Sequence, residues 1–293
     1  MKQPARLLIG ILLTLQFSCN NADTNTKTVV TEKIKIANQG VNVDYDDSKI
    51  GDTTLLFIHG WAIDKTYWEN QVIFFAKKYR VVTIDLPGFG KSGKNRESWT
   101  TENYGKDISA VLTELDLKNV ILVGHSMSGG IAIETALTNP TRIIGVVGVD
   151  NFKQFGIVET KERKEGKANF FKIARADYKD FVVKFVNQDL TSPSTDSLTK
   201  QRVINSLLNV DAKFSVDCLE QVIGYPIDEK LRSYKKTLYL INSSLPPTDT
   251  LAFQKNKIDY CLLNIGPTGH YPMLEKPNDF NLLLQQAING IKK

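Results

Sequence analysis

Apolar runs alternate with amphipathic segments along most of the chain. Continuous apolar runs such as residues 54–58 and 120–123 are typical of parallel strands that are buried on both faces. Between such runs, apolar residues recur at helical spacing, as across residues 104–115. The alternation predicts an α/β fold with a mostly parallel central sheet and helices on both faces. The expected strands are residues 29–36, 41–45, 54–58, 81–84, 120–123, 143–149, 237–241 and 260–264.

One long segment interrupts this rhythm. Residues 151–236 contain no run typical of a buried strand and carry helical patterns instead, at 167–187, 195–209 and 211–223. An all-helical insertion between two strands of one sheet predicts a lid over the carboxyl edge of that sheet. The other expected helices are residues 67–78, 104–115, 126–137 and 280–291.

The first residues have the pattern of a targeting segment. Lys2 and Arg6 precede the apolar run 7–15, which is far shorter than the roughly 20 residues that a membrane-spanning helix needs. Residues 1–18 therefore read as a signal peptide. Cys19 follows directly and begins a polar tether over residues 19–28, so the segment resembles a bacterial lipoprotein signal in which Cys19 becomes lipidated.

The departure from that pattern is Gln16, which stands where Leu is usual. The alternative is an ordinary secretory signal, which would release the protein. We expect a protein of the bacterial cell envelope, held by a lipid anchor on the periplasmic side or the outer surface. Its folded domain would span residues 29–293, with the lid at 151–236.

The composition excludes further classes of protein and of binding partner. With 42% hydrophobic and 24% charged residues, the chain is not of the disordered class. The net charge of +5 comes from scattered Lys and Arg, so no nucleic-acid partner is expected. A small basic group at 161–167 reads as a solvated helix face. The sequence shows neither a metal-ligand cluster nor a phosphate-binding glycine loop, so we expect no metal and no cofactor.

A serine motif follows one of the expected strands. Gly124-His125-Ser126-Met127-Ser128-Gly129-Gly130 lies between strand 120–123 and a helix. A serine in that position sits on a sharp turn with its hydroxyl exposed above the sheet. The usual pattern is G-x-S-x-G, and Ser128 occupies the place of the last glycine.

Two further segments complete a possible catalytic set. His59-Gly60-Trp61 ends strand 54–58, where the Trp61 N–H could join the Met127 N–H in an oxyanion hole. The chain has three histidines, and His59 and His125 belong to these two motifs. His270 lies in a loop between the last strand and the last helix, and it remains as the general base.

Together these motifs resemble the α/β-hydrolase superfamily. The resemblance rests on Ile58-His59-Gly60-Trp61, Asp85–Ser92, residues 124–130 and Gly269-His270-Tyr271-Pro272. It implies a serine hydrolase that cleaves an ester, thioester, lactone or amide of a small molecule through an acyl-enzyme at Ser126. Alternatives are an aminopeptidase, a C–C hydrolase or a haloperoxidase-like activity on the same residues, or a non-catalytic binding protein of the envelope.

The acid of the triad is left open by the sequence. In this superfamily the acid lies between nucleophile and base along the chain, most often after the strand that here is 237–241. No carboxylate stands there near Ser244 or Leu245. Asp150 ends strand 143–149 and is the favoured candidate. Asp249 is the second candidate, although it reads better as a helix N-cap, and a site without an acid is the third possibility.

Overall fold

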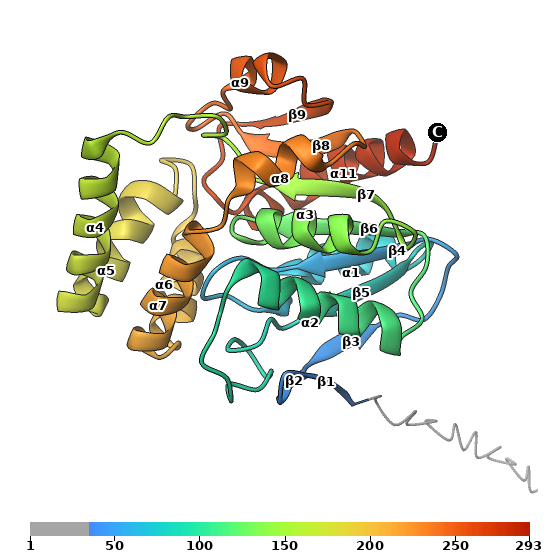
Figure 1. The fold of residues 1–293 in the computed structure, drawn as a ribbon, viewed down its shortest axis with the longest axis horizontal. Coiled ribbons are helices and arrows are strands. Elements are labelled where there is room, and N and C mark those ends of the chain that lie inside the picture. The colour runs from blue at the N-terminus through green and yellow to red at the C-terminus, as the bar shows by residue number, and fades with distance from the viewer. Residues whose placement is uncertain (1–34) are drawn as a thin grey trace, which may run out of the picture. The chain divides into compact units, whose positions relative to one another are not determined.

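The computed structural model describes residues 35–293, whose centre is a seven-stranded sheet (Figure 1). The strand order is β3-β5-β4-β6-β7-β8-β9, and all neighbours pair in parallel except β3 with β5. The α/β-hydrolase fold class predicted from the sequence is thus confirmed. The strands are β3 (Tyr45–Asp47), β4 (Thr54–Ile58), β5 (Arg80–Ile84), β6 (Val120–His125), β7 (Ile143–Val149), β8 (Leu238–Ser243) and β9 (Tyr260–Gly266).

The first strands differ from expectation. The sequence predicts one strand over residues 41–45, but the structure divides this segment between β2 (Val41–Val43) and β3 of the large sheet. β2 pairs with β1 (Ile36–Asn38). The expected strand 29–36 lies almost entirely outside the described residues. In the centre, β4 and β6 are buried at every position, because parallel strands have helices against both faces.

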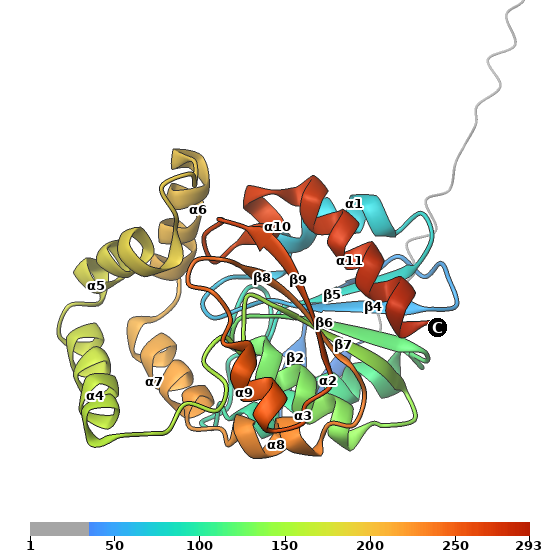
Figure 2. The same cartoon turned by 90° about the horizontal axis from the view of Figure 1, so that it is seen from above.

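Helices cover both faces of the sheet (Figure 2). One face carries α1, α10 and α11, and the opposite face carries α2, α3 and α8. Their apolar sides bury against the strands, as in α11, where Phe280, Leu284 and Ile288 are fully buried. The helices are η1 (Lys65–Trp68, 3-10), α1 (Glu69–Phe75), α2 (Thr101–Glu114), α3 (Ser128–Thr138), α8 (Ile227–Ser233), α9 (Thr250–Lys255), α10 (Pro272–Glu275) and α11 (Pro277–Ile291).

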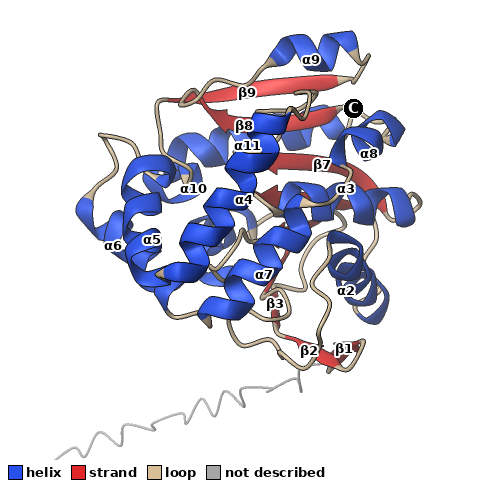
Figure 3. Cartoon of the chain, turned by 60° about the vertical axis from the view of Figure 1, so that its left-hand side comes forward, coloured by secondary structure: helices blue, strands red, loops and turns tan. Residues whose placement is uncertain are grey.

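The segment between β7 and β8 forms a group of helices beside the sheet (Figure 3). The group contains α4 (Lys161–Ala176), α5 (Tyr178–Phe185), the π-helical turn η2 (Val186–Leu190), α6 (Ser197–Leu208) and α7 (Ala212–Ile223). Phe170, Phe181 and Phe185 form its aromatic centre, with ring centroids 5.0 to 5.4 Å apart. The last helix of the segment, α8, instead packs against α3 of the sheet layer.

The helix expected over residues 167–187 is in fact two helices. Asp177 separates α4 from α5, and its carboxylate accepts the Asp180 N–H as the N-cap of the second helix. An aspartate that satisfies a free backbone N–H favours a new helix start over continuation of the old one. The break turns the chain so that α4 and α5 pack on each other. No helix in residues 35–293 is both long and apolar enough to cross a membrane.

Candidate active site

Ser126 lies on the sharp turn between β6 and α3. Its φ is +55°, in the left-handed region that costs a non-glycine residue free energy. The Ser126 N–H donates to the Val149 carbonyl at 2.9 Å, which holds the turn in that conformation. The turn is so tight that a Cβ on Gly124 would lie 2.4 Å from the Ser128 carbonyl oxygen. Position 124 therefore admits glycine alone.

Ser128 replaces the usual last glycine without strain. The left-handed residue of this turn is Ser126, and Ser128 is the first residue of α3 with negative φ. Its buried hydroxyl donates a hydrogen bond to the His59 carbonyl. The departure from the sequence motif therefore links the serine turn to the loop that carries Trp61.

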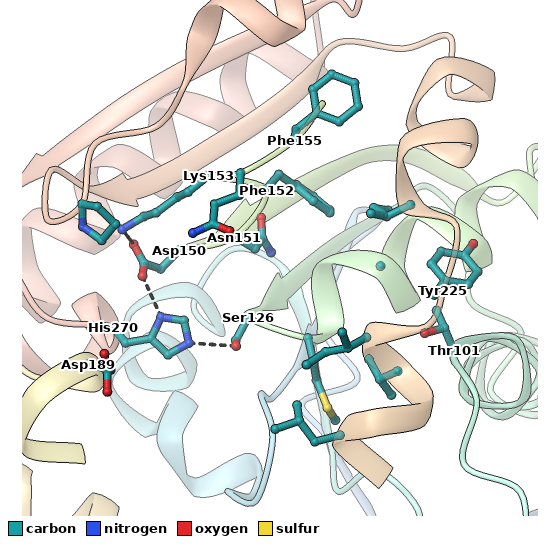
Figure 4. A pocket seen from close by; sticks show the side chains of 18 of the residues that line it. Thr101, Ser126, Asp150, Asn151, Phe152, Lys153, Phe155, Asp189, Tyr225 and His270 are labelled. Atoms are coloured by element: carbon teal, nitrogen blue, oxygen red, sulfur yellow. Dashed lines mark hydrogen bonds and ion pairs between the residues drawn. The ribbon is translucent and has the colours of Figure 1, made fainter. Parts of the chain in front are cut away.

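The structure brings three of the predicted site residues into one chain of hydrogen bonds (Figure 4). His270, in the loop between β9 and α10, has its Nε2 2.8 Å from Ser126 Oγ. Its Nδ1 lies 2.7 Å from Asp150 Oδ2, in the loop after β7. An ionised carboxylate only accepts, so Nδ1 carries the proton and Nε2 is free to accept the serine proton.

Asp150 is buried and has three partners. Beyond His270, its Oδ1 accepts the Ser243 N–H at 2.9 Å and lies 2.7 Å from Lys153 Nζ. Burial disfavours the charged form of the carboxyl, but the hydrogen bonds and charges of His270 and Lys153 outweigh it and lower the pKa of Asp150. Asp150 is therefore an anion at neutral pH.

The other candidate acid has a structural role. Asp249 is the N-cap of α9, and its carboxylate accepts the Leu251 N–H at 3.0 Å. Ser243, the last residue of β8, meets Asp150 with its backbone N–H. The carboxylate that contacts His270 thus comes from the end of β7 and also accepts a hydrogen bond from the end of β8.

The other two histidines, His125 and His59, form hydrogen bonds to the backbone of loops around the site. His125 Nε2 lies 2.7 Å from the His270 carbonyl, which can only accept, so His125 carries its proton there. Burial lowers the pKa of His125 to about 3, with the nearby His270 lowering it further. His59 accepts the Leu86 N–H on Nε2, and burial lowers its pKa as well. Both rings are neutral at physiological pH.

The two expected oxyanion donors flank the serine. Trp61 follows β4, and Met127 is the N-cap of α3, so its N–H belongs to the positive end of that helix. Among the hydrogen bonds of residues 35–293, neither backbone N–H has an acceptor. The Trp61 loop comes close because position 60 is glycine, where a Cβ would meet His125 Nδ1 at 2.5 Å. The Trp61 indole donates to the Ser215 carbonyl of α7 at 2.8 Å.

The loop of His270 is held by residues that the sequence patterns did not identify. The His270 N–H donates to the Leu190 carbonyl of η2 at 2.9 Å. Glu275 Oε2 accepts the Gly269 N–H at 3.0 Å and the Thr195 hydroxyl at 2.6 Å. These contacts tie His270 to the inserted helices. A glutamate six residues after Gly269 gives no motif, so only the folded chain shows this role.

A cavity of about 570 Å³ opens beside Ser126 and His270. Figure 4 shows Ser126 and His270 toward one side of it and Tyr225 and Thr101 toward the other. The wall is mainly apolar and comes from the sheet loops and the inserted helices, including Phe152, Phe185, Leu190, Leu219, Val222 and Leu231. A smaller cavity of about 150 Å³ also borders Ser126, on the side of Trp61 and Tyr271.

The arrangement matches a known family. The family model described as the alpha/beta hydrolase fold matches residues 53–262. The chain belongs to this α/β-hydrolase family. Its members among the relatives are hydrolases and haloperoxidases, which supports an enzyme of that family here.

Three curated relatives show the range of that family. The chain is 27% identical over 251 residues to a putative non-heme chloroperoxidase of Synechocystis sp., covering 78% of this chain and 88% of that one. It is 30% identical over 141 residues to the pimeloyl-[acyl-carrier protein] methyl ester esterase of Wigglesworthia glossinidia brevipalpis, covering 47% and 52%. A 26% identical match to an acetyltransferase component of an acetoin cleaving system from Cupriavidus necator covers 86% and 67%.

Solved structures share the fold at low identity. A bromoperoxidase from Bacillus anthracis superposes with a TM-score of 0.74 at 21% identity, over 87% of this chain and 98% of that one. Est816, an N-acyl homoserine lactone degrading enzyme, gives 0.72 at 22% identity, over 86% and 99%. At such identities the likeness establishes the α/β-hydrolase fold and leaves the substrate to the site.

Proposed function

We propose that this α/β-hydrolase is a serine hydrolase with Ser126 as nucleophile, His270 as general base and Asp150 as the acid of the triad. The observation that carries the proposal is the continuous chain of hydrogen bonds from Ser126 Oγ through His270 to Asp150. In that chain the base can take the serine proton while the carboxylate stabilises the imidazolium.

The steps follow from this geometry. Ser126 Oγ attacks the substrate carbonyl carbon and its proton passes to His270 Nε2. The oxyanion that forms accepts the N–H groups of Trp61 and Met127, a type of contact worth about 10²–10³ in rate per donor. His270 then gives its proton to the leaving group, and an acyl-enzyme remains on Ser126. Water, activated by His270 in the same way, releases the acid.

The cavity supports a small-molecule substrate. Its volume of about 570 Å³ and its largely apolar wall suit an ester, thioester, lactone or amide with an apolar substituent. The inserted helices supply much of that wall, and we assign them the role of a lid that determines which substituent enters. The proposal needs neither a metal nor a cofactor, because the protein groups account for each proton transfer.

The test replaces the nucleophile. Ser126→Ala should abolish turnover of p-nitrophenyl acetate and labelling by a fluorophosphonate probe, whereas Ser244→Ala, in the loop after β8, should retain both. The Ser244 variant controls for general effects of losing a hydroxyl near the site. Labelling that persists in Ser126→Ala would show that another residue is the nucleophile.

A second candidate activity is supported by the relatives. Several are named non-heme chloroperoxidases or haloperoxidases, including the one from Synechocystis sp.. The same serine and histidine could form a peracid from an acyl-enzyme and hydrogen peroxide, with peroxide replacing water as the attacking group. A substrate panel separates the options: peracid formation above ester hydrolysis indicates the second, and faster cleavage of aminoacyl-arylamides indicates an aminopeptidase.

We further propose that the protein is anchored in the bacterial envelope through Cys19. This proposal rests on the sequence of residues 1–28, which lie outside the described part of the chain. Incorporation of labelled palmitate into the wild type and its loss in Cys19→Ser would support it. A protein that is exported without lipid would indicate an ordinary secretory signal instead.

A further inference from the structure

A lysine is paired with the carboxylate of the triad. Lys153 Nζ lies 2.7 Å from Asp150 Oδ1, and the two side chains are only 10% and 4% exposed. The ammonium group also donates to the Leu245 carbonyl at 3.3 Å. Figure 4 shows Lys153 reaching Asp150 on the side away from His270. A cation so close to a buried carboxylate changes how that carboxylate acts on its other partner.

The backbone is shaped to make this contact. Asp150 and Phe152 have φ values of +47° and +54°, so the turn that leads from β7 contains two left-handed residues. Such conformations persist where the surroundings hold them, and they often occur at functional sites. Here they turn the side chain of residue 153 back toward residue 150, while Lys153 O accepts the Asp249 N–H at 3.2 Å.

The carboxylate is therefore shared between two cationic partners during the proposed reaction. Its Oδ2 contacts His270 Nδ1 and its Oδ1 contacts Lys153 Nζ. When His270 takes the serine proton, the imidazolium faces a carboxylate whose charge is already partly neutralised by Lys153. The positive charge of Lys153 opposes the positive charge that forms on the imidazolium.

The other ionisable groups around the pair act differently. His125, whose ring centroid is 4.8 Å from that of His270, is neutral, since burial lowers its pKa to about 3. Burial raises the pKa of Tyr271, so its hydroxyl is also uncharged. Glu275 at the end of α10 and Asp189 at the cavity carry carboxylates, which would favour the imidazolium. Within residues 35–293, the ion-pair partners of Asp150 are His270 and Lys153, and the charge of Lys153 opposes the imidazolium of His270.

We propose that Lys153 is a positioning residue that holds Asp150 against His270 and extends the working range of the base toward acidic pH. The inference rests on the triad proposed above and adds a determinant of its pH dependence. Because Lys153 acts through Asp150, its effect appears in the protonation of His270 and only then in the rate.

The experiment compares a neutral residue and a cationic residue at position 153. In Lys153→Met, the midpoint of His270 protonation, followed by NMR of its imidazole C–H signals, should rise by on the order of one pH unit. The acid limb of the pH profile of kcat/KM should rise with it. Lys153→Arg should leave both close to the wild type, because the positive charge is kept. Lys118→Met, at an exposed ion pair before β6, is the control for loss of one lysine charge.

The outcomes separate the two proposals. An unchanged or lowered midpoint in Lys153→Met overturns the role of Lys153, whatever the enzyme hydrolyses. If the midpoint rises in Lys153→Met but the wild-type protein turns over no ester, thioester, lactone or amide, the coupling is supported and the proposed reaction is rejected. Lys153→Gln, which can still donate to Leu245, provides a second neutral variant if the Met variant is poorly folded. A purely structural role would lower thermal stability in all three variants without moving the midpoint.

Discussion

His125 Nε2 donates a hydrogen bond to the backbone carbonyl of His270, and the two atoms are 2.7 Å apart. The residue before the proposed nucleophile thus holds the loop of the proposed base, although 145 residues separate the two along the chain. Both ends of the Ser126–His270 contact are therefore attached to the same turn, which fixes their distance without any adjustment by the substrate.

Replacing His125 should loosen this attachment. His125→Ala leaves the part-buried His270 carbonyl without its donor, which costs about 1–3 kcal/mol of stability. Displacement of His270 should lower kcat by up to about 10²-fold with a smaller change in KM. Thermal unfolding and steady-state kinetics measure the two effects. His125→Gln, whose amide can reach the same carbonyl, should recover most of the rate; equal losses in both variants would contradict the role of the hydrogen bond.

The two candidate acids should behave differently when neutralised. Asp150→Asn removes the charge that stabilises the His270 imidazolium, and we expect kcat to fall by about 10⁴-fold, as for other triads. Asp249→Asn keeps a helix N-cap at α9 and should alter both rate and stability little. Pre-steady-state kinetics with an activated ester measure acylation directly. A larger loss in the Asp249 variant would reverse the assignment.

The buried neutral histidines predict how stability depends on pH. The pKa of His125 is lowered to about 3 in the folded chain, while the unfolded value is near 6.5. Between these values the unfolded state binds a proton that the folded state does not, so the stability present above pH 6.5 is lost as the pH falls toward 3. Urea unfolding at a series of pH values should show this decline, with a smaller slope in His125→Gln. His59 contributes in the same direction.

Two glycines provide a matched pair for testing the serine turn. Gly124→Ala places a Cβ 2.4 Å from the Ser128 carbonyl, so the turn must shift and activity should be lost. Gly166→Ala, in α4, meets no atom within 4 Å and should stabilise the helix by about 0.5–1 kcal/mol with unchanged activity. Circular dichroism melts and ester hydrolysis report both. An active Gly124→Ala enzyme would mean that the turn is less constrained than its geometry indicates.

The positions of most strands along the chain, and the loops that carry Ser126 and His270, follow from the sequence alone. Buried parallel strands are continuous apolar runs, and a serine between such a run and a helix marks the turn after β6. The sequence pattern does not predict the helix break at Asp177, because apolar spacing continues across it while a local side-chain hydrogen bond starts the new helix. The spacing of apolar residues carries no information about such a hydrogen bond.

Tertiary structure decided which carboxylate contacts His270. Asp150 and His270 lie 120 residues apart, and their contact depends on the pairing of β7 with β8 and of β8 with β9. The sequence could only rank Asp150 above Asp249, because both follow strands at the same edge of the sheet. The pairing of Lys153 with Asp150 was likewise beyond the sequence, since it depends on two left-handed residues whose conformation is fixed by surrounding contacts. Local patterns determine the elements, whereas the distances between side chains on different elements are set by packing.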